Sequence, residues 1–450
     1  MQTTAADLSA IRARLAELER ASATLEPDAK AREELRRPVV RYAEDFLERV
    51  DDAPAYRETE DAGRRVLELE IREEGRPLDE LLDVVESDVD GTGLSPASGG
   101  HLGYIPGGGL YPSSLGDYLA DVTNRYSGLF FPSPGAVRME NQLVRWMAEI
   151  IGYPEESRGD LTSGGSIASL TGIVTAREAR GVHAREVERS AVYLTEQVHH
   201  CVAKALRIAG LGDAPIRTVP MDARYRMDAA ELARLMGADR AAGIRPFLVV
   251  ASAGTTDTGS VDPLGQIADV AAEHGAWLHV DAAYGGFFVL TDEVGDLLAD
   301  LSRADSVVLD PHKGMFLPYG SGAVLVRDGA ALQAAHYYRA SYLRDVPEEQ
   351  DWFSPADHSP ELTRPFRGLR MWLPLQLFGV APFRAALAEK LWLARYFHER
   401  VQEIGGMEVG PEPALSVALF RWVPPGGDDA VGGGGGEGRA LPPPPPPPKP

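Results

Sequence analysis

Two stretches of the sequence, Ala276-Trp-Leu-His-Val-Asp-Ala-Ala-Tyr284 and Ser306-Val-Val-Leu-Asp-Pro-His-Lys-Gly314, indicate both the architecture and the chemistry. Each begins as a short, almost unbroken apolar run, which is typical of a strand buried on both faces of a parallel sheet. Each then ends in polar residues, Asp281 in the first stretch and His312 and Lys313 in the second. Ligands of open parallel sheets bind at the carboxyl ends of the strands, so we expect these three residues to share one site.

The alternation of helix and strand extends from about residue 138 to 330. Helices are predicted at 139–151, 166–180 and 264–274, and strands at 191–195, 247–252, 277–282, 306–310 and 323–326. This order predicts an α/β fold with a mostly parallel central sheet that helices cover on both faces.

Asp281 and Lys313 admit two interpretations. A lysine at a partly desolvated sheet edge has a lowered pKa, which makes its amine nucleophilic toward an aldehyde. A structural ion pair between Asp281 and Lys313 explains the same two residues equally well, because a buried carboxylate needs a partner. These two residues alone leave both interpretations open.

Three more segments carry polar groups next to predicted strands or helices. Thr162-Ser-Gly-Gly-Ser166 precedes a helix, so its amides suit a phosphate, although an ordinary N-cap has the same composition. His199 follows a strand and offers a flat ring to a planar ligand; a metal site with its neighbours lacks a second ligand cluster, so we expect no metal. Thr256 ends Ala253-Gly-Thr-Thr256 after another strand.

Pyridoxal 5'-phosphate (PLP) would use all five of these features. They are Asp281, Lys313, the segment 162–166, His199 and Thr256. It needs a lysine for its aldehyde, a carboxylate for its pyridine nitrogen, amides for its phosphate and a flat group over its ring. The combination is far more specific than any of its parts.

The same segments appear in a characteristic order. They are Tyr104-Ile-Pro-Gly-Gly-Gly-Leu-Tyr-Pro112, Ser163-Gly-Gly-Ser166, His199, Gly254-Thr-Thr256, Val280-Asp-Ala-Ala-Tyr284, Pro311-His-Lys313 and Phe366-Arg-Gly-Leu-Arg-Met-Trp372. From about residue 95 to 423 the chain resembles the PLP-dependent decarboxylases of aromatic amino acids, histidine and glutamate (group II). The resemblance implies the aspartate aminotransferase fold (fold type I) and a homodimer with its N-terminal helices across the interface.

The resemblance also assigns roles to residues. It implies a Schiff base on Lys313, a pyridinium partner in Asp281 and a ring-stacking His199 as the catalytic residues. The implied cofactor-binding residues are Gly164, Gly165, Ser166, His199, Thr256, Asp281, Ala283, His312 and Lys313. Tyr104 and Pro106 are implied on the substrate side.

Two departures from the family pattern bear on the reaction. The family usually supplies a proton-donating tyrosine from a loop that matches residues 343–364, and no tyrosine stands there; Trp352, Phe353 and His358 are the nearest candidates, besides Lys313 itself. In the family, loss of that tyrosine accompanies a switch from amine to aldehyde formation. The C-terminal domain also gives way to a glycine- and proline-rich sequence.

Four regions are predicted: a helical N-terminal segment (1–90), a large PLP-binding domain (91–375), a truncated small domain (376–424) and a disordered tail (425–450). The net charge of −22 argues against nucleic acid and anionic membranes as partners, since both select basic surfaces. The single cysteine and the absence of a secretory or membrane-spanning segment favour the cytoplasm.

The sequence therefore predicts a carboxy-lyase that converts an L-amino acid, aromatic by preference, to its amine and carbon dioxide. Glutamate and diaminobutyrate are the next substrates. An aldehyde-forming decarboxylase, another PLP lyase and a PLP-binding protein without activity are the alternatives. A serine hydrolase is disfavoured, since Gly164-Gly-Ser-Ile-Ala168 lacks the last glycine of its Gly-x-Ser-x-Gly motif.

Overall fold

The computed structural model describes residues 5–105, 107–337 and 353–423. Its centre is a seven-stranded sheet. In spatial order the strands are β3 (Arg158–Thr162), β9 (Gly322–Val326), β8 (Ser306–Leu309), β7 (Trp277–Asp281), β6 (Arg245–Ser252), β4 (Ser190–Leu194) and β5 (Ile216–Thr218). All neighbours pair in parallel except β9, which is antiparallel to both β3 and β8. The predicted mostly parallel sheet is confirmed.

The direction of β9 follows from how the chain leaves β8. Residues 310–321 form the short helix α11 (Pro311–Gly314) and a turn at the sheet edge instead of a helical crossover. Without a crossover that returns the chain to the other end of the sheet, the next strand runs back antiparallel. The strand β3, on the other side of β9, again runs parallel to β8. Its carboxyl end therefore lies at the same edge as those of the other parallel strands.

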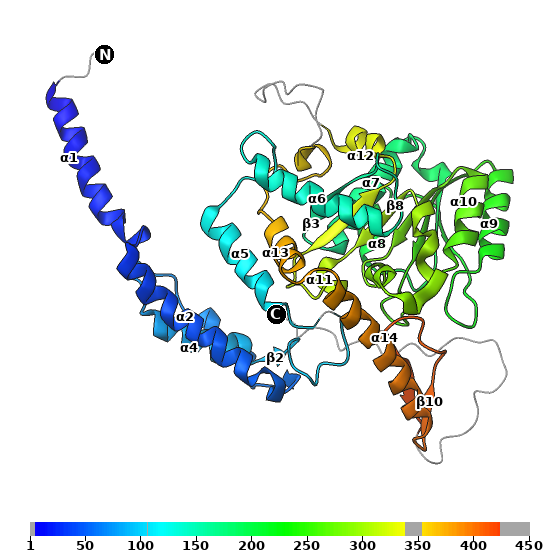
Figure 1. The fold of residues 1–450 in the computed structure, drawn as a ribbon. Coiled ribbons are helices and arrows are strands. Elements are labelled where there is room, and N and C mark those ends of the chain that lie inside the picture. The colour runs from blue at the N-terminus through cyan, green and yellow to red at the C-terminus, as the bar shows by residue number, and fades with distance from the viewer. Residues whose placement is uncertain (1–4, 106, 338–352, 424–450) are drawn as a thin grey trace.

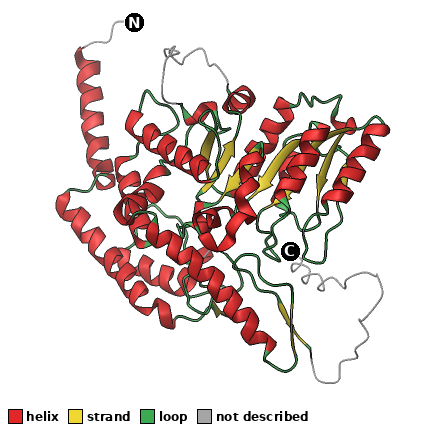
Figure 2. Ribbon diagram, turned by 45° about the vertical axis from the view of Figure 1, so that its right-hand side comes forward, coloured by secondary structure: helices red, strands yellow, loops and turns green. Residues whose placement is uncertain are grey.

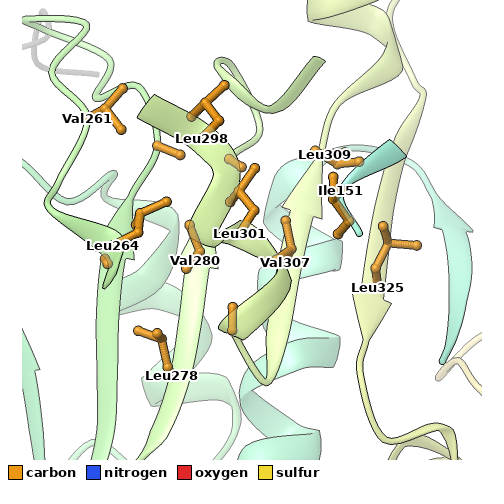
Figure 3. Close-up of a cluster of buried hydrophobic side chains, with 14 of the residues drawn as sticks. Ile151, Val261, Leu264, Leu278, Val280, Leu298, Leu301, Val307, Leu309 and Leu325 are labelled. Atoms are coloured by element: carbon orange, nitrogen blue, oxygen red, sulfur yellow. The ribbon is translucent and has the colours of Figure 1, made fainter. Parts of the chain in front are cut away.

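Helices cover both faces of the sheet (Figure 2). They are α6 (Pro134–Ile150), α7 (Gly165–Ala179), α8 (Cys201–Ile208), α9 (Ala229–Ala241), α10 (Leu264–His274), α12 (Gly329–His336) and α14 (Ala381–Gln402). One core joins α6, α9, α10 and α14 to one face, and a second joins α7, α8 and α12 to the other. Adjacent strand residues alternate between them: Val307 lies in the first core and Val308 in the second. Figure 3 shows part of the first core.

The N-terminal segment is only partly helical. It contains α1 (Ala5–Ser22), α2 (Ala29–Arg49), the short helix α3 (Arg65–Glu68) and α4 (Leu78–Val84), followed by a π-helical turn to Asp90. The expectation of helix throughout was wrong at the two-residue strand β1 (Tyr56–Arg57), which pairs with β2 (Gly93–Leu94). In Figure 1, α1 extends away from the body of the molecule.

The C-terminal part of the described chain is small. Helix α5 (Tyr111–Thr123) packs on α13 (Gly368–Phe378), and α14 is followed by the hairpin of β10 (Met407–Val409) and β11 (Phe420–Trp422). The predicted tail lies outside the described residues. Within the described ranges no single helix is long and apolar enough to cross a membrane, although α13 and α14, bent by 96°, pass that test as a pair.

A buried ionic cluster fastens the segment before α13 to the sheet. Arg364, with a fully buried side chain, hydrogen-bonds both Glu140 of α6 and Asp160 of β3. Burial raises the pKa of Glu140 and that of Asp160, and the charge of Arg364 opposes this rise. The Glu140 carboxylate also accepts hydrogen bonds from the amides of Arg367 and Gly368, at 3.0 and 3.1 Å.

We predict that Arg364→Met destabilises the fold by about 3–5 kcal/mol, because it leaves two buried carboxylates without their cation. Urea unfolding at neutral pH measures this change. Arg400→Met, which removes an exposed pair with Glu403, is the control and is expected to cause almost no change. Equal stabilities of Arg364→Met and Arg400→Met would contradict the role of the cluster.

Candidate active site

A cavity of about 240 Å³ opens at the carboxyl ends of β3, β4, β6, β7 and β8. Its lining comes from the segments that directly follow those strands. The lining residues are Ser163, Gly164, Gly165, Ser166, Ile167, Gln197, His199, Cys201, Ser252, Gly254, Thr255, Thr256, Asp281, Ala283, Tyr284, Asp310, His312 and Lys313. The structure thus brings together every cofactor-binding residue that the sequence predicted.

The backbone at the start of α7 is shaped for close approach. Gly164 has φ +146°, a conformation that favours glycine, and precedes the first turn of the helix. The amide of Gly164 donates to Thr162 Oγ1 at 3.3 Å. Gly322 of β9 lies so near that a Cβ there would come within 2.6 Å of Gly164 Cα. Residues 163–167 at this helix end line the cavity, where the positive end of the helix dipole favours an anion.

Asp281 lies at the end of β7 with its carboxylate fixed by the main chain. Its Oδ1 accepts a hydrogen bond of 3.1 Å from the amide of Ala283. Its backbone carbonyl accepts one of 2.8 Å from Ala253, which ties the end of β7 to the end of β6. The small side chain of Ala283 leaves room beside the carboxylate for a ligand.

Lys313 is paired with Asp310 and not with Asp281. Its Nζ lies 3.0 Å from Asp310 Oδ2, one helical turn away in α11. A structural ion pair between Asp281 and Lys313, which the sequence left open, is therefore not the arrangement found. The side chain of Lys313 is 24% exposed and lies in the cavity lining, so its amine is accessible to a ligand.

Two histidines border the site. Burial and the neighbouring His200 lower the pKa of His199, so its ring is neutral and can stack on a planar group. The rings of His199 and His200 are tilted, with centroids 4.0 Å apart. Burial also lowers the pKa of His312, to about 4, and its Nδ1 contacts the backbone of Ser321.

Apart from Lys313, the residues predicted on the substrate side or as proton donors lie outside the cavity lining or outside the described residues. Tyr104 is 72% exposed and stacks on His101, with ring centroids 6.1 Å apart, outside the cavity lining. Pro106 lies outside the described residues, as does Trp352.

His358 is buried near Arg158 at the amino end of β3, which is the end of the sheet opposite the cavity, and burial lowers its pKa to about 3. Within one chain, His358 therefore lies at the wrong end of the sheet to deliver a proton to the cavity.

Several lining residues were not predicted from the sequence. Asp310 directly follows β8 and precedes Lys313 by three residues, a spacing that could have revealed it. Tyr284 hydrogen-bonds Ser416 Oγ at 2.6 Å, which brings the C-terminal segment to the cavity wall; no sequence signal pointed to this long-range contact. Among the described residues no group of three or more His, Cys, Asp or Glu side chains could hold a metal ion.

A family model described as the pyridoxal-dependent decarboxylase conserved domain matches residues 64–423. The chain belongs to this family. The PLP cofactor, the carboxy-lyase class and the α/β fold predicted from the sequence are thereby confirmed. The backbone cradle before α7, the accessible amine of Lys313 and the fixed carboxylate of Asp281 are the groups that PLP requires.

Named relatives differ in substrate. An aromatic-L-amino-acid decarboxylase of Bacillus atrophaeus is 32% identical over 324 residues, which cover 72% of this chain and 67% of that protein. An L-2,4-diaminobutyrate decarboxylase of Acinetobacter baumannii is 30% identical over 333 residues, covering 70% of this chain and 65% of that protein. The chain thus spans about two thirds of the length of these relatives.

The structural comparison agrees with the family. A crystal structure of Oryza sativa TDC with PLP and tryptamine has a TM-score of 0.83 and 28% identity, covering 88% of this chain and 84% of that chain. A structure of mouse CSAD has a TM-score of 0.79 and 25% identity, covering 89% of this chain and 84% of that chain.

We predict that Gly322→Ala weakens PLP binding by about tenfold or more, equivalent to ~1.4 kcal/mol or more. The new Cβ would lie 2.5 Å from the carbonyl carbon of Gly164 and displace the loop before α7. Equilibrium titration of the cofactor-free protein measures the loss. Gly237→Ala in α9, where a Cβ meets nothing within 4 Å, is the matched control and should bind PLP normally. Unchanged PLP affinity in Gly322→Ala would show that the loop does not bind the cofactor.

Proposed function

We propose that this chain decarboxylates an L-amino acid, aromatic by preference, with PLP held covalently at Lys313. The observation that carries the proposal is one cavity lined by Lys313, Asp281, His199 and the glycine loop before α7. Each of these groups has the chemistry that one part of PLP needs, which supports the proposal. The aromatic preference rests on the resemblance to relatives and not on pocket side chains.

The residues divide the work of holding the cofactor. The amides of Gly165 and Ser166 would bind the phosphate, aided by the dipole of α7. Asp281, oriented by the amide of Ala283, would accept a hydrogen bond from the protonated pyridine nitrogen. The neutral ring of His199 would cover one face of the cofactor, and Ala283 would lie against the other.

PLP supplies an electron sink for the bond that breaks at the substrate's α-carbon. Asp281 would keep the pyridine nitrogen protonated, which the electron sink requires. Lys313 would hold the cofactor through its Nζ until a substrate amine takes its place. The released Nζ remains in the cavity, where it can carry a proton to or from the α-carbon.

The identity of the final proton donor separates two reactions. With no tyrosine in 343–364 and His358 at the opposite end of the strands, we propose that Lys313, which lines the cavity, donates the proton that gives the amine. Without that proton, dissolved oxygen could act as the two-electron oxidant, and with water the products would be an aldehyde, ammonia and hydrogen peroxide. An aldehyde-forming decarboxylase is therefore the second candidate function, favoured by the missing tyrosine.

We predict that the purified protein has a visible band of lysine-bound PLP and releases carbon dioxide from an aromatic L-amino acid. Lys313→Ala should lose the band and all turnover. Asp281→Ala should keep the band and lose turnover by roughly a hundredfold or more, since the nitrogen loses its anionic partner. Absorbance and an amino-acid panel, with carbon dioxide, amine, aldehyde and peroxide assayed together, measure these effects.

The outcomes are distinct. Amine as the product supports the proposed decarboxylase, whereas aldehyde with peroxide supports the second candidate. A normal band without carbon dioxide from any amino acid would indicate a PLP-binding protein that has lost its activity. Full turnover by Lys313→Ala would overturn the scheme.

We also propose that the chain acts as a homodimer in the cytoplasm. Helix α1 carries a row of apolar side chains that are exposed in the single chain: Leu8 at 49%, Ile11 at 50%, Leu15 at 59% and Leu18 at 46%. A second copy is the partner that the family resemblance implies for this face. Cell fractionation would test the compartment, which the single buried Cys201 favours.

We predict that Ile11→Glu with Leu15→Glu converts the dimer to a monomer, because two charges would enter the apolar interface. Light scattering after size-exclusion chromatography measures the mass. Arg12→Glu with Arg14→Glu, on the same helix, is the control for added negative charge and should remain dimeric. A monomeric wild-type protein at micromolar concentration would refute the homodimer.

A further inference from the structure

Asp310 is a second carboxylate in the cavity, distinct from Asp281. It directly follows β8 and is 1% exposed. Its Oδ2 lies 3.0 Å from Lys313 Nζ and 3.6 Å from His312 Nε2. Its Oδ1 is buried and has no hydrogen-bond partner among the described residues. A buried oxygen without a partner is costly, so Oδ1 is a vacant position for a ligand or a proton.

The carboxylate of Asp310 lies against the loop that would bind the phosphate of PLP. A Cβ placed on Gly165 would come within 2.9 Å of Oδ2 and 3.3 Å of Oδ1. A hydrogen bond from the backbone amide of Gly165 also acts on this carboxyl group and lowers its pKa. A phosphate bound to the start of α7 would therefore stand next to a buried carboxylate.

Two anions this close in a buried site repel each other strongly. Four titratable groups face or act on Asp310: Lys313 and His312 of α11, Asp281 of β7 and the Cys201 thiol of α8. Burial lowers the pKa of His312 to about 4, so it contributes no positive charge near neutral pH. Lys313 is the cation paired with Asp310, and its amine is also the group to which PLP would bond covalently.

Burial raises the pKa of Asp310 to about 6, with Lys313 opposing the rise and Asp281 adding to it. In the cofactor-free protein the carboxyl group is therefore mostly ionised above that pH. Condensation of Lys313 with the PLP aldehyde would release the aldehyde oxygen as water and, where a neutral imine forms, one proton from the ammonium to solvent. Asp310 would then lose its cation, and the phosphate would add negative charge beside it. Both changes favour the protonated acid.

We propose that Asp310 is a positioning residue that couples cofactor loading to proton uptake. Before loading, its carboxylate pairs with the Lys313 ammonium. On loading, the carboxylate takes one proton from solvent at Oδ1, and the new O–H can donate to a phosphate oxygen. The inference rests on the proposed placement of the phosphate before α7 and of the PLP aldehyde at Lys313.

The direction of the pH effect follows from linkage. A ligand that raises the pKa of a group binds most tightly at a pH at which that group is already protonated. The affinity of the ligand then falls as pH rises through the pKa that the group has in the ligand-free protein. Above about pH 6, the affinity of the wild-type protein for PLP should fall relative to that of Asp310→Asn. The ratio of the two dissociation constants should rise by up to about tenfold per pH unit until the loaded protein also ionises.

The test uses the full chain freed of cofactor, in phosphate-free buffers from about pH 6 to pH 8, titrated with PLP, pyridoxal and inorganic phosphate. Asp310→Asn keeps the shape of the side chain and removes its charge. Asp305→Asn is the control, because Asp305 is a half-buried carboxylate just before the amino end of β8, away from the cavity, and desolvation raises its pKa too. Calorimetry in two buffers of different ionisation enthalpy counts the protons bound.

For PLP and for inorganic phosphate, we expect the ratio of the dissociation constants of wild type and Asp310→Asn to rise with pH. For pyridoxal, which has no phosphate, we expect this ratio to rise less. Asp305→Asn should follow the wild type. Calorimetry should find close to one more proton taken up by the wild type than by Asp310→Asn at the upper end of the pH range. Where the variant is poorly stable, the wild type and Asp305→Asn alone supply the test: their proton uptake on loading should rise as pH increases through about 6.

Parallel pH profiles of wild type and Asp310→Asn, with equal proton counts, would overturn the inference. The proposed function would then survive if the visible band still depends on Lys313. A protein that binds neither PLP nor phosphate at any pH would remove both proposals. An equal ratio for PLP and pyridoxal would assign the effect to Lys313 alone and overturn the part played by the phosphate.

Discussion

Burial of the central sheet on both faces is the constraint on which the rest of the structure depends. The strands place mostly apolar side chains against the two cores, as Val307 and Val308 do on opposite faces. The polar side chains of the site therefore lie just after the strands, where the chain leaves the sheet. Five parallel strands have their carboxyl ends around the cavity, at the same end of the sheet. Residues far apart in the sequence therefore meet there because the strands place them, without needing direct contacts between their side chains. The active site is in this sense a consequence of how the core is packed.

The same constraint explains which parts of the fold could be predicted. The strands β4, β6, β7 and β8 are apolar runs, and their sequences predicted both the strands and the polar residues after them; β9 was predicted as a strand alone. In contrast, β3 contains Arg158 and Asp160 and gave no such pattern. Asp160 is tolerated in a buried strand because Arg364, about two hundred positions later in the chain, neutralises it. A pattern read within a short window does not contain that partner.

The substrate side of the site illustrates a different limit. Cofactor-binding residues follow strands, whose positions the hydrophobic pattern fixes. Tyr104 belongs to a glycine-rich segment and is 72% exposed, so neither the core nor the sheet fixes where it lies in the single chain. Tyr284 meets Ser416 only through the return of the C-terminal segment. The cofactor can thus be inferred from sequence far more directly than the amino acid it acts on.

Asp281 and Asp310 end adjacent strands of the same sheet, yet their surroundings separate their chemistry. Asp281 is partly accessible, and its Oδ1 is satisfied by the amide of Ala283. Asp310 is almost fully buried, and its Oδ1 lacks a partner among the residues described. One carboxylate is therefore built to remain an acceptor for a cationic ring nitrogen. The other depends for its charge on a lysine that the cofactor would consume, so its protonation has to respond to whether the site is loaded.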